Sequence, residues 1–271
     1  TQGVSSAASD VYKRQVSLIA FSVMGDTPYS ASDAQKLKYQ LANLRPSNEF
    51  AVHLGDIKTG LMPCSESWYQ MVARILRQSP RPLFIIPGDN EWNDCFNPKE
   101  AWKLWVRYFL HFDKQWPTNR HIDRDSRHPE NFAFVSNGVL LVGIKLVGGK
   151  VLDPIQWVLQ DQNNVEWIEK QWRNSNKSIS RLVIFGHALP SKNHRDFFIL
   201  LQRFAHSFEK PILYLHGDGH FWEEEYPFMS KNIWRVQIQQ GGRANPVTVM
   251  VTDDSDDCLL YTSDAADDTP C

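Results

Sequence analysis

The stretch VSLIAFSVMGD, residues 16–26, joins a run of apolar residues to a glycine and an aspartate. A short apolar run of this kind predicts a buried β-strand, and the Gly-Asp pair marks the point where the strand ends. The same arrangement recurs in FAVHLGD (50–56) and PLFIIPGDNE (82–91), and with histidine in RLVIFGH (181–187) and PILYLHGDGH (211–220). Five predicted strands therefore end on glycine followed by residue types that bind metal ions.

Helical patterns separate these strands. The helix after the first strand is expected to begin at a capping box of Ser32 and Gln35, and residues 65–76 have an apolar face at helical spacing. Strands that alternate with helices predict βαβ units and an α/β fold. Residues 233–239 and 246–252 alternate with period two, so we expect them to form an added antiparallel hairpin.

The composition is that of a globular protein. The chain has 271 residues, of which 42% are hydrophobic and 22% charged with both signs present, so it can bury one large core and is not a disordered protein. The net charge of −2 gives no support for a nucleic-acid partner, and no apolar run is long enough to predict a membrane span. The motifs of serine hydrolases, P-loop NTPases and Rossmann enzymes do not occur.

One domain is expected between residues 16 and 255. Residues 1–15 and 256–271 lack apolar periodicity and look like translated adaptor sequence, so we expect non-native, disordered tails; disordered native tails are the alternative. Without these ends two cysteines remain, Cys64 and Cys95. A disulfide between them would fit an exported or periplasmic protein, and two buried free thiols are an equally good interpretation.

The strand ends predict a shared metal site. In open α/β sheets the functional crevice lies outside the carboxyl ends of the strands, and glycine there permits the tight turn that aims the next side chain into it. A single Gly-Asp after a strand is more often a structural turn. Carboxylates and imidazoles that converge from five strand ends would repel one another or stay unpaired unless a cation lay among them.

These motifs resemble those of the calcineurin-like metallophosphoesterases. That family has Asp-x-His, Gly-Asp, Gly-Asn-His-Glu or -Asp, a late His and Gly-His-x-His, each at a strand end. The order and spacing fit over residues 16–254. The strings GDTPYS (25–30), GDIK (55–58), PGDNEWNDC (87–95) and HGDGHFW (216–222) are more specific than a bare Gly-Asp and are similar to those of a bacterial branch of the family.

The resemblance implies a four-layer αββα sandwich and a metal-dependent phosphoester hydrolase. Its nucleophile would be a hydroxide that bridges two divalent ions (Mn, Fe or Zn), and its substrate a small phosphorylated molecule, a mono- or diester. Asp56 would bridge the two ions. The implied metal ligands are Asp26, Asp56, Asp89, His187, Asp218 and His220. The sequence predicts neither the oligomeric state nor the identity of the substrate.

Four positions depart from the family pattern. Pro28 stands where the first motif has histidine, and Asn90 stands at the position of the catalytic histidine. Asp89 and Asp218 replace an asparagine and a histidine ligand, although the Gly-Asp-Asn-Glu string can also be aligned so that Asn90 is the ligand. Because both family histidines are missing, an alternative function stays open, in which the fold has lost turnover and binds a ligand, a metal or a protein partner.

Three further residues are candidates for catalysis. Without a histidine at position 90 the expected general acid is missing, a group typically worth about 10²–10⁴-fold in rate. Glu91 is adjacent and His216 directly precedes Gly217, so either could replace it. Lys58 could neutralise phosphate charge, or be a solvated loop lysine.

Overall fold

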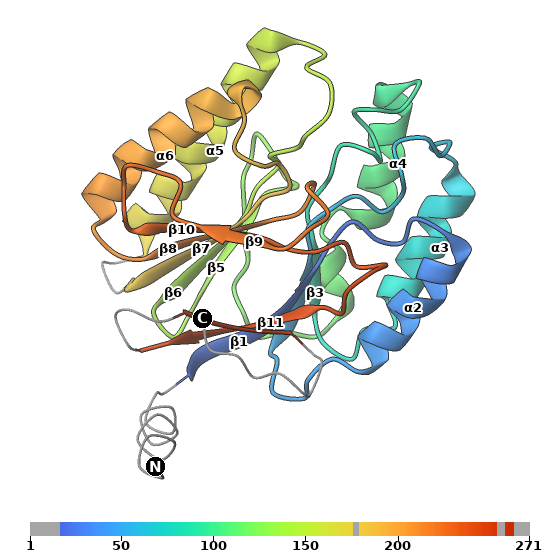
Figure 1. Ribbon diagram of the computed structural model, residues 1–271, viewed down its shortest axis with the longest axis horizontal. Coiled ribbons are helices and arrows are strands. Elements are labelled where there is room, and N and C mark those ends of the chain that lie inside the picture. Colours follow the sequence, from blue (N-terminus) through green and yellow to red (C-terminus); the bar gives the residue numbers. More distant parts are fainter. Residues whose placement is uncertain (1–16, 176–178, 254–257, 263–271) are drawn as a thin grey trace, which may run out of the picture.

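The computed structural model describes residues 17–175, 179–253 and 258–262. Two mixed β-sheets face each other in the middle of the molecule, and helices cover the outer side of each sheet (Figure 1). The predicted α/β fold with four αββα layers is therefore confirmed. Within the described residues no helix combines the length and apolar character that a membrane span requires.

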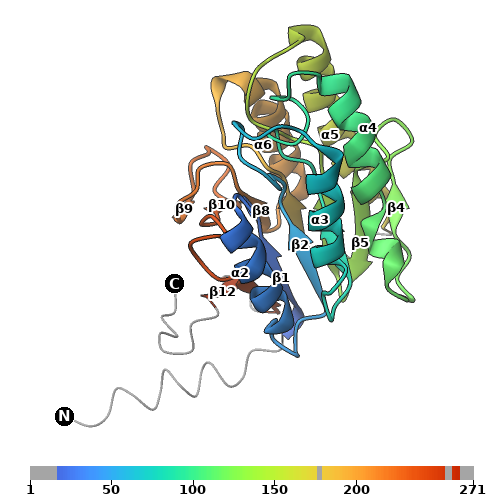
Figure 2. The same cartoon turned by 90° about the vertical axis from the view of Figure 1, so that its right-hand side faces the viewer.

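The first sheet has the strand order β12-β11-β1-β2-β3. Its strands β1, β2 and β3 are parallel, and β11 is antiparallel to β1. Helices α2, α3 and α4 cover it, as Figure 2 shows in face view. The bounds are β1 Ser17–Met24, α2 Ala31–Ala42, β2 Phe50–His53, α3 Glu66–Leu76, β3 Leu83–Ile85, α4 Pro98–Phe109, β11 Val247–Thr252 and β12 Cys258–Thr262.

The second sheet has the strand order β4-β5-β6-β7-β8-β10-β9. Strands β6, β7, β8 and β10 are parallel, and helices α5 and α6 pack on the outer face (Figure 1). The bounds are β4 Asp123–Arg124, β5 Phe132–Ser136, β6 Val139–Gly143, α5 Pro154–Asn174, β7 Arg181–Phe185, α6 Arg195–Phe208, β8 Ile212–His216, β9 Glu223–Glu225 and β10 Ile233–Gln237. Two short 3₁₀ helices, η1 Phe112–Gln115 and η2 Lys192–His194, complete the elements.

Aromatic side chains fill the core between the sheets. Phe50 of β2 stacks on Phe21 with ring centroids 4.9 Å apart and meets Phe134 of the opposite sheet edge-on at 5.3 Å. Alternate residues of the same strands, such as Ala51 and Met24, pack outward against the helices. Burial on both faces explains why these strands are continuous apolar runs without polar alternation.

Two sequence expectations about local structure are wrong. Residues 233–239 and 246–252 do not pair as a hairpin, since β10 joins β8 in the second sheet and β11 joins β1 in the first. Period-two alternation identified both strands but could not specify their partners. Helix α2 begins earlier than its predicted capping box, because the hydroxyl of Ser30 accepts the backbone N–H of Asp33 at 3.1 Å.

The expected tails are described only in part. Residues 1–15 lie outside the described residues. Residues 258–262, which we expected to lie outside the domain, form strand β12 and pair antiparallel with β11. The other residues of 256–271 lie outside the described part of the chain.

Candidate metal centre

The parallel strands bring the predicted ligands to one rim. Met24 of β1 pairs with His53 of β2, and His53 pairs with Ile85 of β3, so the residues that follow these strands emerge side by side. The second sheet contributes from β7 and β8, whose ends pair in the same way. The backbone N–H of Asp218 lies 3.3 Å from both carboxylate oxygens of Asp26, which ties the two sheets together at this rim.

Two groups of candidate ligands result, and they share one residue. Asp26, Asp56 and His187 form the first, and Asp89, His187 and Asp218 form the second. Within each group the ligand atoms lie within 4.8 Å of one another. Four of the six predicted ligands, all aspartates, thus gather around the imidazole of a fifth, His187. His220 approaches the same cluster, with Nε2 3.3 Å from Oδ1 of Asp26.

Four of these residues adopt a left-handed backbone conformation. The φ angles are 55° at Asp26, 58° at Asp56, 70° at Asp218 and 67° at His220. Residues with a side chain rarely adopt positive φ, although aspartate and histidine tolerate it better than most. Such conformations cluster at functional sites, where the surrounding structure imposes them.

The strand-end glycines were expected to permit the tight turns, but most of them serve close packing against the carboxylates instead. Of the five, only Gly55 has a positive φ, at 92°. The tight turn is made by the aspartates themselves, and glycine is needed for close approach. A Cβ atom would lie 2.2 Å from Oδ1 of Asp56 if placed on Gly88, and 2.4 Å from Oδ2 of Asp26 if placed on Gly217.

His187 presents one nitrogen to the carboxylates. Its Nδ1 donates to the backbone carbonyl of Leu54 at 2.8 Å, which leaves the lone pair of Nε2 directed at Asp89 Oδ1 (3.2 Å) and Asp56 Oδ1 (3.4 Å) in the neutral ring. A metal-binding histidine is typically oriented in this way by a bond from its other nitrogen. Nε2 of His187 and Oδ1 of Asp89 are buried without a hydrogen-bond partner among the described residues.

The electrostatics indicate an excess of buried negative charge. Burial, reinforced by the charge of Asp89, raises the pKa of Asp56 and of Asp218, and His187 only partly offsets this. Burial opposes protonation of His187, but the neighbouring carboxylate of Asp56 raises its pKa above the usual value. A divalent cation would satisfy the orphaned atoms and balance the charge, and the mix of carboxylate oxygens and imidazole nitrogens suits such an ion.

Tyr29 is a site residue that sequence reasoning missed. Its hydroxyl lies 3.2 Å from Asp26 Oδ1, 3.1 Å from Asp56 Oδ2 and 3.2 Å from His220 Nε2. Burial and the nearby charge of Asp56 raise the pKa of its phenol, which stays protonated. The signal was present in the string GDTPYS, where the tyrosine directly follows Pro28, the residue that stands in place of the family histidine.

Asp89 and Asn90 have different surroundings. Asp89 belongs to the second ligand group with His187, whereas Asn90 donates its backbone N–H to Asp56 Oδ1 at 3.0 Å and its side-chain amide to Asp56 Oδ2. Burial acts to raise the pKa of Asp89, but the neighbouring His187 holds it below its usual value. Asp89 thus lies in a group of candidate ligands, whereas Asn90 contacts the carboxylate of another candidate ligand, Asp56.

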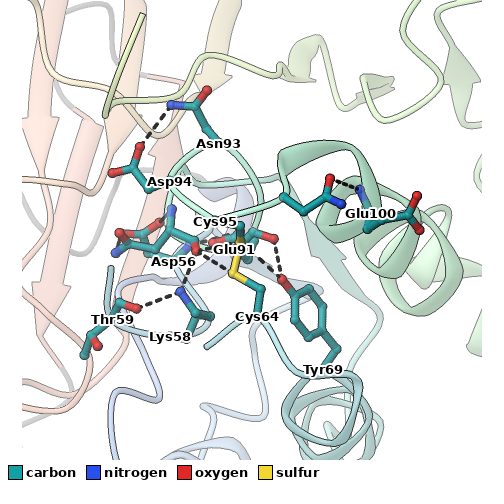
Figure 3. Close-up of a disulfide and its surroundings, with 12 residues drawn as sticks. Asp56, Lys58, Thr59, Cys64, Tyr69, Glu91, Asn93, Asp94, Cys95 and Glu100 are labelled. Atoms are coloured by element: carbon teal, nitrogen blue, oxygen red, sulfur yellow. Dashed lines mark hydrogen bonds between the residues drawn. A yellow bond between two sulfur atoms is a disulfide. The ribbon is translucent and has the colours of Figure 1, made fainter. Parts of the chain in front are cut away.

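Glu91 and Lys58 hold the loops that carry the ligands. Oε1 of Glu91 accepts the backbone N–H of Gly88 at 2.6 Å and that of Asp56 at 3.2 Å. Nζ of Lys58 donates to the carbonyls of Thr59 at 2.7 Å and Asn90 at 2.6 Å (Figure 3). Both side chains are fully buried, so these contacts favour a positioning role.

His216 is engaged at both ring nitrogens. Nδ1 donates to the carbonyl of Gly217 at 2.8 Å, and Nε2 accepts from Nε of Arg235 at 2.8 Å. Burial, together with the charge of Arg235, lowers the pKa of His216 to about 3. A ring held neutral in this way has no proton to give at neutral pH, so its surroundings offer no support for His216 as the general acid.

Cys64 and Cys95 form a disulfide beneath the site (Figure 3). Their Cα atoms lie 6.0 Å apart, and their sulfurs lie 3.8 and 3.6 Å from the carbonyl oxygen of Asn90. Lys58 donates to the same oxygen. The disulfide therefore packs against the loop that carries Asp89 and Asn90.

Comparisons with solved structures agree with this architecture. A dimetal phosphatase from Danio rerio superposes with a TM-score of 0.60 at 12% identity, over 91% of this chain and 99% of its own. A purple acid phosphatase from yellow lupin (Lupinus luteus) seeds gives 0.55 at 11% identity, over 89% of this chain and 50% of its own. A 5′-nucleotidase from Candida albicans gives 0.52 at 15% identity, over 91% and 52%. No protein-family model and no curated protein matches the sequence.

At these identities the likeness concerns the fold. The chain spans about half the length of the nucleotidase and of the purple acid phosphatase, and nearly all of the Danio rerio phosphatase. The protein therefore has the fold of the metal-dependent phosphatases, with two groups of candidate metal ligands at the rim of its sheets.

Proposed function

We propose that this protein is a metal-dependent phosphoesterase, which hydrolyses small phosphate mono- or diesters with two divalent cations. The cations would be held by Asp26, Asp56 and His220 on one side and by Asp89, His187 and Asp218 on the other, with Asp56 shared. When bound, such ions withdraw charge from the phosphoryl oxygens and lower the pKa of the attacking water. Mn, Fe and Zn fit the mixed oxygen and nitrogen ligands.

The orientation of His187 carries the proposal. Two buried carboxylates face Nε2 of a ring whose Nδ1 donates to a backbone carbonyl. With a cation bound, the ring would be neutral and would offer its Nε2 lone pair to the ion, while the bond from Nδ1 keeps the ring in that orientation. The two ligand groups and the phosphatase fold support the same assignment.

The other residues of the chain would position these ligands. Asn90 binds both oxygens of Asp56, and Glu91 fixes the backbone of the Asp56 loop. Lys58 secures the loop of Asn90 through its carbonyl. His220 is the most open of the proposed ligands, with 41% of its side chain exposed, so we propose that substrate enters on its side of the cluster.

The proposal extends to location. A structural disulfide persists mainly in oxidising compartments, and the Cys64–Cys95 bond therefore supports export or a periplasmic site.

The test compares the full-length protein with Asp56→Asn. Asparagine keeps the shape of the side chain but removes the charge that the two cations would share. Both proteins are dialysed against Mn²⁺, their bound metal is measured, and they are assayed on a chromogenic phosphodiester and a chromogenic monoester. We expect two ions per wild-type chain and a loss of turnover of at least about 100-fold in the variant, since both cations would be weakened.

A result in which wild type binds metal but shows no Asp56-dependent turnover on a broad panel of phosphoesters would contradict the proposal. It would point instead to a phosphoesterase-like fold that binds metal or a ligand without catalysis.

A further inference from the structure

A buried carboxylate and a buried imidazole form a pair outside the candidate metal centre. Asp161 of α5 is 1% exposed and His194 of η2 is 4% exposed. Nδ1 of His194 lies 3.0 Å from Oδ1 of Asp161, and Nε2 lies 2.6 Å from the backbone carbonyl oxygen of Val147. Neither residue belongs to the two groups of candidate metal ligands, so this pair has no role in the site described so far.

The pair directs one N–H of the imidazole at Val147. A carbonyl oxygen can only accept a hydrogen bond, so Nε2 of His194 is the donor in this contact. Asp161 holds the opposite side of the ring, as a carboxylate commonly does for a histidine whose orientation matters. Trp157 of α5 stacks on the face of the ring, with centroids 4.9 Å apart and planes 19° apart. The imidazole is therefore held at both nitrogens and on one face.

Val147 belongs to residues 146–149, which follow β6 without regular secondary structure and are named here the exit segment. The carbonyl of Leu146 accepts the backbone N–H groups of His187 and Ala188, each at 2.9 Å. Just past the segment, the carbonyl of Lys150 accepts Nδ2 of Asn93 at 2.8 Å. His194 binds the chain between these two anchors, where a buried carbonyl outside a helix or sheet needs a partner.

The exit segment touches each member of one ligand group, that of Asp89, His187 and Asp218. Its first carbonyl binds the backbone of His187. A Cβ atom placed on Gly148 would lie 2.6 Å from Oδ2 of Asp218 and 3.0 Å from Oδ1 of Asp89. One placed on Gly149 would lie 2.9 Å from Oδ2 of Asp89. The backbone next to Val147 therefore forms the surface on which these two carboxylates rest.

We infer that Asp161 and His194 are positioning residues, which hold the exit segment against the Asp89 group and so set the geometry of one of the two cation sites. The inference rests on the proposed function, which gives this group its cation. The carboxylates of the other site follow strands of the first sheet and are held there by Tyr29 and Asn90. Loss of the pair should therefore affect the two cations unequally.

The test compares two variants of the full-length protein that differ in reach. His194→Gln keeps an amide N–H near the position of Nε2, so it can still donate to the carbonyl of Val147. His194→Asn carries the same amide on a shorter side chain, near the position of Nδ1, and cannot reach that carbonyl. Both variants lose the imidazole, so a loss of packing affects both alike. His206→Asn, at an exposed histidine of α6, is the control.

The first readout is Mn²⁺ affinity, measured by isothermal titration calorimetry. Anomalous difference maps of crystals grown at limiting Mn²⁺ show which of the two ions is weakened. We expect His194→Asn to weaken the ion beside the Asp89 group by about 10-fold, in the range for partners that orient metal ligands, and to leave the other ion unchanged. His194→Gln and the control should bind both ions nearly as wild type does.

The second readout needs no metal. Crystal structures of the metal-free proteins should show the exit segment displaced from Asp89 and Asp218 in His194→Asn, and in its wild-type position in His194→Gln. Asp161→Ala, which keeps the imidazole but frees its Nδ1, should give a smaller loss of affinity at the same ion. It also tests the pair if the histidine variants do not fold, since wild-type Mn²⁺ affinity in Asp161→Ala would overturn the inference.

The outcomes separate this inference from the proposed function. Equal losses in His194→Gln and His194→Asn, equal losses at both ions, or unchanged affinity in every variant would overturn the positioning role and leave the phosphoesterase intact. A wild type that binds no Mn²⁺ would contradict the proposed function. The metal-free structures then decide the positioning role: displacement of the exit segment in His194→Asn alone supports it, and identical structures overturn it.

Discussion

Nδ1 of His187, which follows β7 in the second sheet, donates to the backbone carbonyl of Leu54, which follows β2 in the first sheet, at 2.8 Å. Like the contact between Asp218 and Asp26, this bond joins the two sheets at the rim where the acidic residues gather. It also fixes the ring so that Nε2 faces Asp56 and Asp89. His187 is therefore both a bridge between the sheets and the residue that the two ligand groups share.

Replacement of His187 should remove a ligand of one of the two proposed cations. We expect His187→Ala to lower the metal content measured after dialysis against Mn²⁺ from two ions per chain to about one, and to abolish phosphoesterase activity. The carboxylates would then repel one another without a nitrogen between them. A variant that retained two ions would show that the imidazole of His187 is not a ligand.

Tyr29 contacts three of the proposed ligands, and its phenol can donate only one hydrogen bond at a time. In Tyr29→Phe the carboxylates of Asp26 and Asp56 lose this partner, while the ring remains. We expect about 10–100-fold weaker binding of one of two Mn²⁺ ions, the usual cost of losing an outer-shell contact. Isothermal titration calorimetry with Mn²⁺ would measure this affinity. The matched control is Tyr39→Phe, which alters an exposed tyrosine of α2. Unchanged Mn²⁺ affinity at both sites would show that Tyr29 does not support metal binding.

Asn90 stands where the family pattern that the motifs resemble has a catalytic histidine. Without a proton donor, hydrolysis should depend strongly on the acidity of the leaving group, so p-nitrophenyl phosphate should be cleaved much faster than an alkyl phosphate. We expect Asn90→His to speed hydrolysis of the alkyl ester by about 100-fold and to affect the p-nitrophenyl ester little. Equal acceleration of both esters would mean that the histidine acts through the metal site and not as an acid.

His53 should make the protein sensitive to acid. Burial lowers the pKa of His53 to about 4, although the hydrogen bond that Nε2 donates to the carbonyl of Thr27 acts in the opposite direction. Nδ1 accepts the N–H of Gly55. A histidine with a lowered folded-state pKa binds more protons when unfolded, so its contribution is complete above about pH 6.5 and is lost as the pH falls towards 4.

The comparison is urea denaturation of wild type and His53→Gln at pH 7.5 and pH 5. We expect wild type to lose about 2 kcal/mol more unfolding free energy between these pH values than the variant loses. Identical losses would show that His53 is not held neutral in the fold.

The disulfide should contribute to stability. Residues 64 and 95 are 31 positions apart, and closing a loop of that length is worth about 3–4 kcal/mol in the chain-entropy model. The double variant Cys64→Ser, Cys95→Ser should therefore have a lower urea midpoint. Because the bond packs against the carbonyl of Asn90, we also expect weaker Mn²⁺ binding in the variant. Loss of stability with unaltered Mn²⁺ binding would restrict the disulfide to a structural role.

Much of the fold could be read from local patterns. The continuous apolar runs predicted buried parallel strands, and the strand-end motifs predicted which rim would carry the acidic residues. The partners of β10 and β11 could not be predicted, because alternation specifies a face of a strand and not its neighbour. The start of α2 was misjudged for a similar reason, since several polar residues near Ser30 could cap it.

The site was predictable where side chains follow a strand directly. Asp26, Asp56, Asp89, His187 and Asp218 each come within two residues of a strand end or of its glycine, so strand register places them. The role of Tyr29 depends on how the loop after β1 folds back over the cluster, which no spacing rule gives. The engagement of His216 with Arg235 likewise depends on the pairing of β8 with β10, a contact distant in sequence.

The most direct test of the account is an anomalous difference map from crystals of the full-length protein soaked in Mn²⁺. We expect two manganese peaks at the rim, one beside the group Asp26, Asp56 and His187 and one beside the group Asp89, His187 and Asp218. A map without a peak at this rim, in which these side chains pair only with one another, would contradict the metal centre and the phosphoesterase proposed from it.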